Sequence, residues 1–265
     1  MPFRKSFTKG FVLFCLLASL CYSLQIYAQS EKLTKQGYLQ KYFGKLCQQK
    51  SRATATLYVD GSPLRILAIL PRNYAITKAG KLNSQQMFEV EWQRKRFSAI
   101  WIGKDPINDL LLLKIQSPKE LPSFDVQRKI SIPIGSWAIS LGPQGFLKGG
   151  IVSAIHRDVR PNPRGGLLSI YGMLGLTGSG PKRSYKDVIQ HDGPVENKYL
   201  GSPLINSKGE LLGINISFAY RGTGFAVSRE YLRKILPKLK NMAKKKAFLG
   251  VFLAETPKGL QVTNL

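Results

Sequence analysis

Histidine and cysteine are scarce in this chain of 265 residues. The two histidines, His156 and His191, are not surrounded by a pattern of metal-ligating partners, so the sequence predicts no metal site and no cofactor. Cys15 and Cys21 lie near the N-terminus, which leaves Cys47 alone in the remainder. A lone cysteine excludes an internal disulfide once the N-terminal segment is removed. We interpret Cys47 as a packed thiol, with an intermolecular bridge as the alternative.

Acidic residues are scarce as well. The chain has 15 Asp and Glu against 40 Lys and Arg, which gives a formal net charge of +25. A positive field of this size attracts polyanions such as anionic lipid headgroups, acidic polysaccharide or nucleic acid. No nucleic-acid-binding motif accompanies the basic stretches, which are densest at 157–164, 182–186 and 229–246. Binding to a polyanion or a membrane surface therefore stays an alternative, beside a well-solvated surface with no such partner.

Residues 1–28 have the pattern of a signal peptide. Basic residues precede an apolar stretch at 11–26, and Ala28 marks a cleavage position. We therefore expect export to the periplasm or beyond the cell, with a charge of +22 on the mature protein. The alternative is an uncleaved N-terminal membrane anchor, because Ile26 is larger than cleavage prefers and the apolar run is near the lower length limit of a spanning helix.

Short apolar runs separated by Gly and Pro turns predict an all-β fold. The strands expected in a first barrel are 55–59, 65–70, 88–92, 97–102 and 110–115. Those expected in a second barrel are 136–141, 150–155, 167–172, 203–207, 211–217 and 224–228. Residues 117–131, polar and with two prolines, form the expected linker between them. The predicted domains are an N-terminal segment with the first barrel at 29–120, and the second barrel with a C-terminal helix at 121–246.

Four sequence blocks in a fixed order indicate a family. They are GKDPINDLLLLKI at 103–115, IPIGSWAISLGPQGFLKGGIVSAIHR at 132–157, IQHDGPVENKYLGSPLINSKGELLGINIS at 189–217 and GTGFAVSREYLRKIL at 222–236. Together they resemble the HtrA/Deg branch of the trypsin-like serine proteases, where the third block reads IQTDAAINxGNSGGPLxNxxGExIGINT. The resemblance implies two packed six-stranded β-barrels followed by a C-terminal helix.

The same resemblance places the catalytic positions. Asp109 falls on the aspartate of the catalytic triad, whereas Leu200 falls on the serine and Gly80 on the histidine. Lys198 replaces a glycine of the turn that binds the oxyanion. Acyl transfer needs a hydroxyl nucleophile, a base within hydrogen-bond reach and donors for the oxyanion. With Asp109 alone retained, the resemblance implies a degenerate and inactive site.

Ser202 is a weaker candidate nucleophile, two residues beyond Leu200. A nearby lysine, Lys78, Lys81 or Lys198, would then serve as the base, as lysine dyads do in other folds. Ser202 falls on the second glycine of the motif, and a lysine base must be desolvated to lose its proton near neutral pH. We therefore regard this dyad as the less favoured prediction.

Neither histidine is expected to replace the lost base. His191 adjoins Asp192, but adjacent residues of a strand point to opposite faces, so no His–Asp couple is predicted. We interpret His191 as a strand residue that substitutes for the family's threonine. His156 is expected at the exposed end of the strand at 150–155.

A helix is predicted over 228–246, with Ser228 as its N-cap. Its apolar residues are expected to pack on the second barrel, and Pro237 is expected to end or kink it. Between the second and third of these blocks, the segment 160–183 replaces a shorter loop of the family and has an apolar centre. That centre suits either a partner-binding tip or an ordinary extended hairpin.

Residues 247–265 resemble the opening of the PDZ domain that follows the protease unit in this family. Phe248 to Val251 fall on its carboxylate-binding loop. Nineteen residues are too few for a PDZ domain, so we expect a remnant and no peptide capture by that route.

The resemblance and the degenerate triad together imply a pseudoprotease. We expect it to bind an extended peptide or unfolded protein segment by strand addition, or to regulate an active relative of its family. The alternatives are a serine endopeptidase that works through Ser202, and a polyanion or membrane-surface binding protein. Polyanion binding weakens steeply as salt rises, whereas strand addition does not.

Overall fold

The computed structural model describes residues 18–22, 37–38, 40–159, 184–219, 222–245, 252–256 and 259–263. Its contacts divide the chain into two units, Met1–Leu46 and Cys47–Leu265. The described residues of the first unit are helical. No helix within the described ranges combines the length and the apolar character needed to cross a membrane. Ala28 and most of the predicted signal peptide lie outside these ranges.

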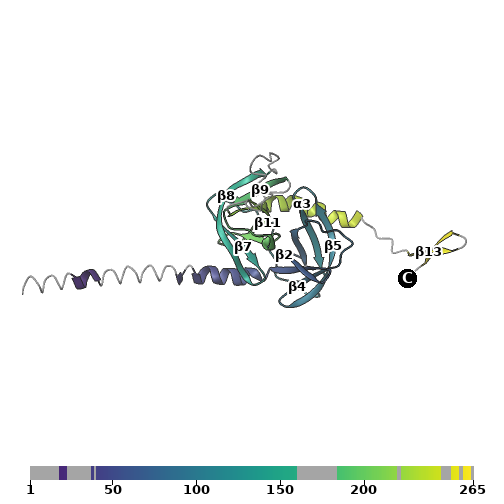
Figure 1. Ribbon diagram of the computed structural model, residues 1–265, viewed down its shortest axis with the longest axis horizontal. Coiled ribbons are helices and arrows are strands. Elements are labelled where there is room, and N and C mark those ends of the chain that lie inside the picture. The colour runs from purple at the N-terminus through teal and green to yellow at the C-terminus, as the bar shows by residue number, and fades with distance from the viewer. Residues whose placement is uncertain are drawn as a thin grey trace, which may run out of the picture. The chain divides into compact units, whose positions relative to one another are not determined.

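Six antiparallel strands form a first closed barrel in the order β1-β2-β3-β6-β5-β4 (Figure 1). The strands are β1 (Thr54–Val59), β2 (Ser62–Leu70), β3 (Tyr74–Lys78), β4 (Phe88–Trp92), β5 (Lys95–Asp105) and β6 (Leu110–Ile115). Alternate positions of these strands, such as Leu111 and Leu113 of β6, fill one apolar core. Five of the six strands were predicted, and β3 was missed because its sequence had been assigned to the turn around Gly80.

A second closed barrel follows, in the order β10-β11-β12-β9-β8-β7. Its strands are β7 (Trp137–Gly142), β8 (Gly145–Val159), β9 (Tyr185–His191), β10 (Pro203–Ile205), β11 (Leu211–Ala219) and β12 (Thr223–Ser228), with a short 3-10 helix, η1 (Asn197–Tyr199), before β10. The prediction of two six-stranded barrels with a C-terminal helix is confirmed. β9 was not among the predicted strands, and the strand predicted at 167–172 lies outside the described residues.

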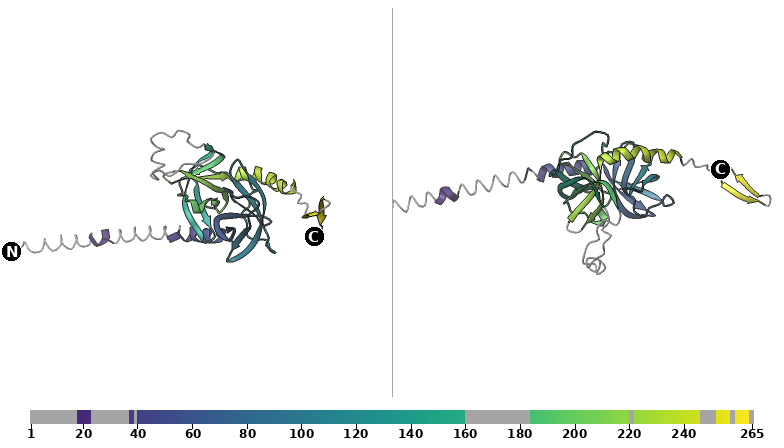
Figure 2. Two further views of the ribbon diagram at one scale, coloured as in Figure 1. Left: turned by 45° about the vertical axis from the view of Figure 1, so that its right-hand side comes forward. Right: turned by 90° about the horizontal axis from the view of Figure 1, so that it is seen from above.

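The C-terminal helix α3 (Arg229–Lys245) begins where predicted, because the Ser228 hydroxyl accepts the backbone N–H of Tyr231 at 3.1 Å. It does not end at Pro237, which lies inside the helix. The helix packs against β5 of the first barrel as well as β11 and β12 of the second, as Figure 2 shows. The expected packing on the second barrel is confirmed, and the helix packs on the first barrel as well. Its buried residues Leu232, Leu236 and Leu239 help to hold both barrels together.

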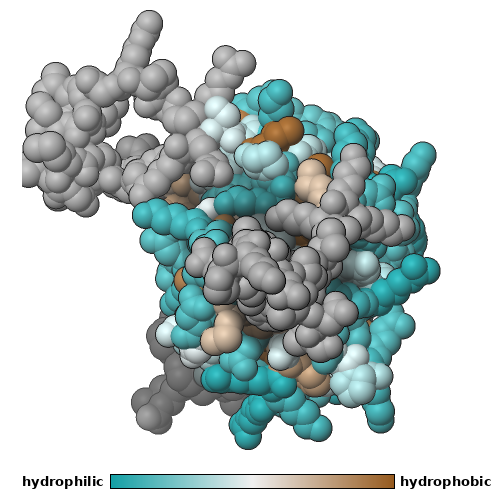
Figure 3. Space-filling view, turned by 90° about the vertical axis from the view of Figure 1, so that its right-hand side faces the viewer, coloured by the Kyte–Doolittle hydropathy of each residue, from teal (hydrophilic) through white to brown (hydrophobic). Residues whose placement is uncertain are grey.

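Strands β13 (Phe252–Thr256) and β14 (Gly259–Thr263) pair as an antiparallel hairpin within the segment predicted to be a PDZ remnant. The predicted carboxylate-binding loop at 248–251 and the segment 160–183 lie outside the described residues. The face of the molecule in Figure 3 is mostly hydrophilic, and its apolar side chains form small separate patches. Such scattered apolar residues are normal for a protein surface.

Candidate active site

The turn between β5 and β6 brings the first barrel against the second. The Asp105 carboxylate fixes this turn by accepting the backbone N–H groups of Ile107 at 3.0 Å and Asn108 at 3.2 Å. The buried Asn108 side chain then reaches β9, where it donates to the Lys186 carbonyl at 2.9 Å and accepts the Lys186 N–H at 2.7 Å. The next residue, Asp109, is thereby held where the two barrels meet.

Asp109 is buried, and each of its carboxylate oxygens has a partner. Oδ1 accepts the backbone N–H of Gly80 at 3.0 Å, and Oδ2 forms an ion pair with Lys78 Nζ at 3.0 Å. Lys78, the last residue of β3, also donates to the Tyr185 hydroxyl at 3.0 Å and to the Ile216 carbonyl at 2.7 Å. Because Tyr185 lies on β9 and Ile216 on β11, the lysine ties the first barrel to the second.

Gly80, predicted to stand at the histidine position, has a backbone that disfavours any side chain. Its φ is +60°, in the left-handed region. A Cβ at this glycine would also lie 2.7 Å from Nη2 of Arg65, a residue of β2. Burial lowers the pKa of the Arg65 guanidinium, while the charges of Asp109 and Tyr185 raise it. The space beside Gly80 thus holds a guanidinium group, which does not act as a proton acceptor.

Leu200, predicted at the serine position, is buried and follows η1. The backbone N–H of Leu200 donates to the Asn197 carbonyl at 3.3 Å, so this N–H points back into the turn. In acyl transfer such N–H groups must point at the developing oxyanion. The next residue, Gly201, has φ of +96°, and a Cβ there would overlap Thr77 Oγ1 and the Ile66 carbonyl. The turn is therefore packed tightly against the first barrel.

The Ser202 hydroxyl is enclosed in the second barrel. The residue has no exposed surface, and its Oγ accepts a hydrogen bond from Asn215 Nδ2 at 2.9 Å. The same Nδ2 donates to Ser140 Oγ at 2.9 Å, which uses both amide protons. Asn215 Oδ1 is then an acceptor for His191 Nε2 at 3.0 Å. Ser202 is thus part of a buried polar network and does not face the solvent.

The three lysines weighed as bases for Ser202 have other surroundings. Lys78 is paired with Asp109, and Lys81 is exposed. Lys198 is exposed and lies 3.3 Å from a Glu196 carboxylate oxygen. Hydrogen bonds to Tyr199 and then to Glu196 raise the pKa of Lys198, which favours its charged form. A lysine base would need a neutral amine beside the Ser202 hydroxyl, and none of these contacts provides one.

The two histidines also have partners other than Asp109. His191 ends β9, and burial lowers the pKa of its imidazole to about 4. His156 is exposed, as predicted, and its Nδ1 lies 2.7 Å from Asp187 Oδ1. It does not end its strand, because β8 continues to Val159. The strand bulges at this point, where His156 has φ of +53° and the pairing with β9 shifts register.

Asp192 follows His191 but makes no direct hydrogen bond with it among the described contacts. Its Oδ1 accepts the backbone N–H of Ile151 at 2.6 Å, and its charge only partly offsets the effect of burial on His191. Within the described ranges, no three His, Cys, Asp or Glu side chains gather in a way that would hold a metal ion. Cys47 is buried, and burial raises the pKa of its thiol.

The sequence did not reveal the Lys78–Asp109 pair or the roles of Arg65 and Tyr185. Lys78 had been considered only as a base for Ser202. One signal was available: once β3 and β6 are paired, Lys78 lies opposite Leu110, directly beside Asp109. That register could not be assigned while β3 was read as a turn.

Comparison with known proteins gives the family. The sequence profile of the trypsin-like peptidase domain matches residues 65–214, more than half of the chain. A probable periplasmic serine endoprotease DegP-like of Hahella chejuensis is 28% identical over 202 residues, which cover 72% of this chain and 37% of that protein. The periplasmic serine endoprotease DegP of Escherichia coli K12 is 25% identical over 191 residues, covering 69% of this chain and 37% of DegP.

The serine endoprotease DegS of Salmonella typhimurium is 30% identical over 177 residues, which cover 63% of this chain and 45% of DegS. The chain spans between about a third and a half of the length of these relatives. The matched residues run from β2 of the first barrel into β11 of the second. This chain therefore belongs to the trypsin-like peptidase domain family and is distantly related to the DegP and DegS serine endoproteases.

Proposed function

We propose that this protein is a catalytically inactive member of its family that acts by binding. The observation that carries the proposal is the ion pair between Asp109 and Lys78. A carboxylate that would orient a histidine is instead neutralised by an ammonium group. Leu200 supplies no nucleophilic atom and Gly80 no base, and triad residues contribute to catalysis as a unit. Asp109 by itself then gives no useful rate.

An open strand edge supports a peptide-binding role. β10 pairs with β11 no further along than Ile214, while β12 pairs with the opposite side of β11 through Ala219. Within the described residues, Ser217–Ala219 therefore has a strand partner on one side only. An extended peptide that adds to this edge gains main-chain hydrogen bonds without any catalytic group. The ligand class is a peptide or an unfolded protein segment, and an active relative of the family is a second partner of this kind.

Export belongs to the same proposal. Relatives that carry the name DegP are described as periplasmic, and residues 1–28 have the pattern of a signal peptide. A protein in that compartment would meet unfolded segments during their transit. Fractionation of cells that express the full chain tests this part: the protein is expected in the periplasmic fraction, and recovery with the cytoplasm would contradict it.

Loss of catalysis is tested with residues 29–265. The purified protein is treated with a fluorophosphonate probe and assayed for casein digestion, beside Ser202→Ala and an active serine endoprotease. We expect no labelling and no cleavage from either form of this protein. Labelling and cleavage that disappear in Ser202→Ala would overturn the proposal in favour of a serine endopeptidase.

Binding is tested separately, with fluorescently labelled, unfolded casein as the probe. Fluorescence anisotropy at low and high sodium chloride distinguishes the two modes of binding. Strand addition predicts an affinity that changes little with salt, since main-chain hydrogen bonds carry it. A steep loss of affinity with rising salt would instead indicate binding of the acidic casein by the protein's positive charge.

A further inference from the structure

A pocket of about 370 Å³ lies where α3 begins, beside the core of the second barrel. The linker between the barrels, β8, β9 and the first residues of α3 all contribute to its walls. Basic side chains line one part of the pocket, chiefly Arg128, Arg229 and Arg233. Its volume falls within the range typical of small-molecule sites, which is roughly 300–1,000 Å³.

Arg229 is the unusual member of this set, because it is a buried cation that forms no ion pair within the part of the chain that the structure describes. Only 3% of its surface is exposed. Its Nε donates to the Val126 carbonyl at 3.3 Å and its Nη1 to the Leu211 carbonyl at 3.4 Å, both long contacts. Its Nη2 and the Nε of neighbouring Arg233 are buried and have no hydrogen-bond partner among the described residues. Buried donors of this kind normally find an acceptor.

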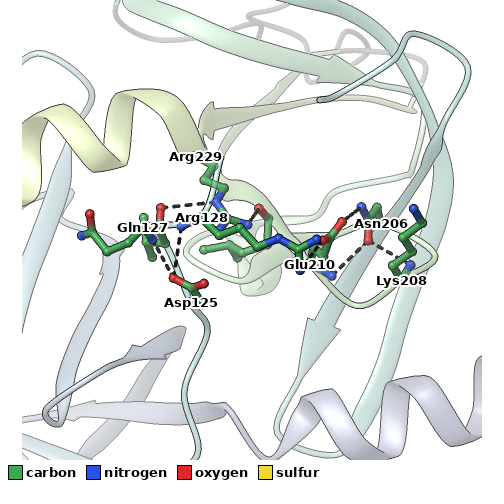
Figure 4. Close-up of polar contacts among 9 residues, drawn as sticks. Asp125, Gln127, Arg128, Asn206, Lys208, Glu210 and Arg229 are labelled. Carbon is green, nitrogen blue, oxygen red and sulfur yellow. Dashed lines mark hydrogen bonds and ion pairs between the residues drawn. The ribbon is translucent and has the colours of Figure 1, made fainter. Parts of the chain in front are cut away.

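Asp125 and Glu210, the two carboxylates whose charges act on Arg229, have other hydrogen-bond partners, as Figure 4 shows. Asp125 accepts the backbone N–H groups of Gln127 at 2.7 Å and Arg128 at 3.4 Å. Glu210 accepts Asn206 Nδ2 at 2.8 Å and lies 3.5 Å from the Arg128 guanidinium. Burial first lowers the pKa of Arg229, the charges of Asp125 and Glu210 raise it, and those of Arg233 and Arg128 lower it again. The cations around Arg229 thus crowd one another.

The rest of the pocket is apolar. Ile130, Ile132 and Ile155 are partly buried and pack on the core of the second barrel, while their remaining surface faces the pocket. Glu230 also lines the pocket, and its carboxylate lies 3.5 Å from Lys234 Nζ. The pocket therefore combines positive charge with an aliphatic wall. These features are complementary to an anion that carries a hydrocarbon chain.

We propose that this pocket binds a small organic carboxylate with an aliphatic chain. Its carboxylate would accept hydrogen bonds from Arg229 and Arg233, and its chain would lie on Ile130, Ile132 and Ile155. Because the Arg229 donor is buried, the carboxylate reaches it only if side chains that line the pocket move, and one of them, Arg128, is 72% exposed. The bound carboxylate supplies the counterion that Arg229 lacks within the described structure.

Isothermal titration calorimetry with hexanoate tests the proposal. The purified residues 29–265 are titrated in 0.15 M sodium chloride, with acetate and 1-hexanol as probes of the charged group and the chain alone. We expect hexanoate to bind with a dissociation constant on the order of 1 mM or below, and both partial probes to bind more weakly. No heat from hexanoate, or equal binding of acetate, would overturn the proposal.

Two variants locate the site. Arg233→Gln removes one proposed hydrogen-bond donor, and Ile132→Ser removes part of the apolar wall, so each should weaken hexanoate binding by about tenfold. Lys238→Gln is the matched control, because it removes the same charge from an exposed position of α3 outside the pocket. Equal weakening by Lys238→Gln, or unchanged binding in both pocket variants, would show general charge attraction and contradict the site. Circular dichroism confirms that each variant is folded before titration.

Discussion

Two cations in this molecule, the partly buried Lys78 and the buried Arg229, have opposite surroundings. An ammonium group has three N–H donors, and Lys78 directs Nζ at three acceptors, Asp109, Tyr185 and Ile216, at 2.7 to 3.0 Å. Arg229 has five donors, yet it makes two long contacts with carbonyl oxygens and leaves Nη2 without a partner in the described structure.

The difference separates a structural network from a candidate ligand site. Lys78 uses each of its three N–H donors, and these contacts join the two barrels. Around Arg229 hydrogen-bonding capacity is left over, and burying such a group without compensation is costly. The N–H donors of Lys78 are thus all used within the protein, whereas Nη2 of Arg229, at the start of α3, has no partner in the described structure.

The largest effect is expected from breaking the Lys78 network. Asp109→Asn keeps the shape of the side chain but leaves the ammonium of Lys78 buried without a counterion. Removing one partner of a buried ion pair costs about 3–5 kcal/mol. We expect the free energy of unfolding, measured by urea denaturation, to fall by an amount in this range.

The double variant Lys78→Met, Asp109→Asn is the control for this loss. It keeps an asparagine at position 109, whose φ of +58° that side chain tolerates, and removes the Lys78 charge, so the penalty for an unpaired charge disappears. The double variant should therefore be more stable than Asp109→Asn alone. If Asp109→Asn costs less than about 1 kcal/mol, as an exposed pair would, the network is not the structural joint described above.

His191 gives the next largest effect, and it depends on pH. The folded protein keeps this imidazole neutral down to a pKa of about 4, whereas an unperturbed histidine is protonated near 6.5. Between these values the unfolded chain binds more protons, so stability falls as the pH is lowered from about 6.5 to 4. At pH 4.5 the loss from this residue should be about 2–3 kcal/mol relative to pH 7.

Urea denaturation at both pH values, with His191→Gln as the comparison, isolates this contribution. The glutamine can still donate to Asn215 but does not titrate, and the other acidic and basic groups act equally in both proteins. The variant should therefore lose less stability than the parent on acidification. Parallel losses in the two proteins would mean that His191 is not held neutral by burial.

The sequence predicts the fold more fully than it predicts the site. The barrels follow from short apolar strands and from blocks of known order, so their number and the C-terminal helix were predicted. Asp109 directly precedes Leu110–Leu113 within the sequence block 103–115, and the alignment of that block with the family has little freedom. The partner of Asp109 could not be predicted, because Lys78 reaches it only through the pairing of β3 with β6.

Arg229 shows the same limit more clearly. In the sequence it is one of many basic residues of α3, and nothing in the helical pattern separates it from its exposed neighbours. Its burial arises because the linker and β11 both pack over the start of the helix, where Val126 and Leu211 supply the two carbonyls. Burial by segments that are distant in sequence depends on the tertiary fold, so the local pattern of charges does not predict it.

The smallest effect on stability is expected from Arg229 itself, and it tests the comparison most directly. Arg229→Met keeps much of the length of the side chain while it removes the charge. Within the described residues Arg229 forms no ion pair and makes only long hydrogen bonds. Relief of its desolvation should therefore offset the contacts that are lost, as for other buried charges replaced by apolar groups. We expect urea denaturation to show a change within about 1 kcal/mol in either direction, with Lys238→Met as the exposed control. If Arg229→Met instead lowers the free energy of unfolding as much as Asp109→Asn does, the fold depends on Arg229 as it depends on Lys78. The contrast between a structural cation and a candidate ligand site would then be wrong.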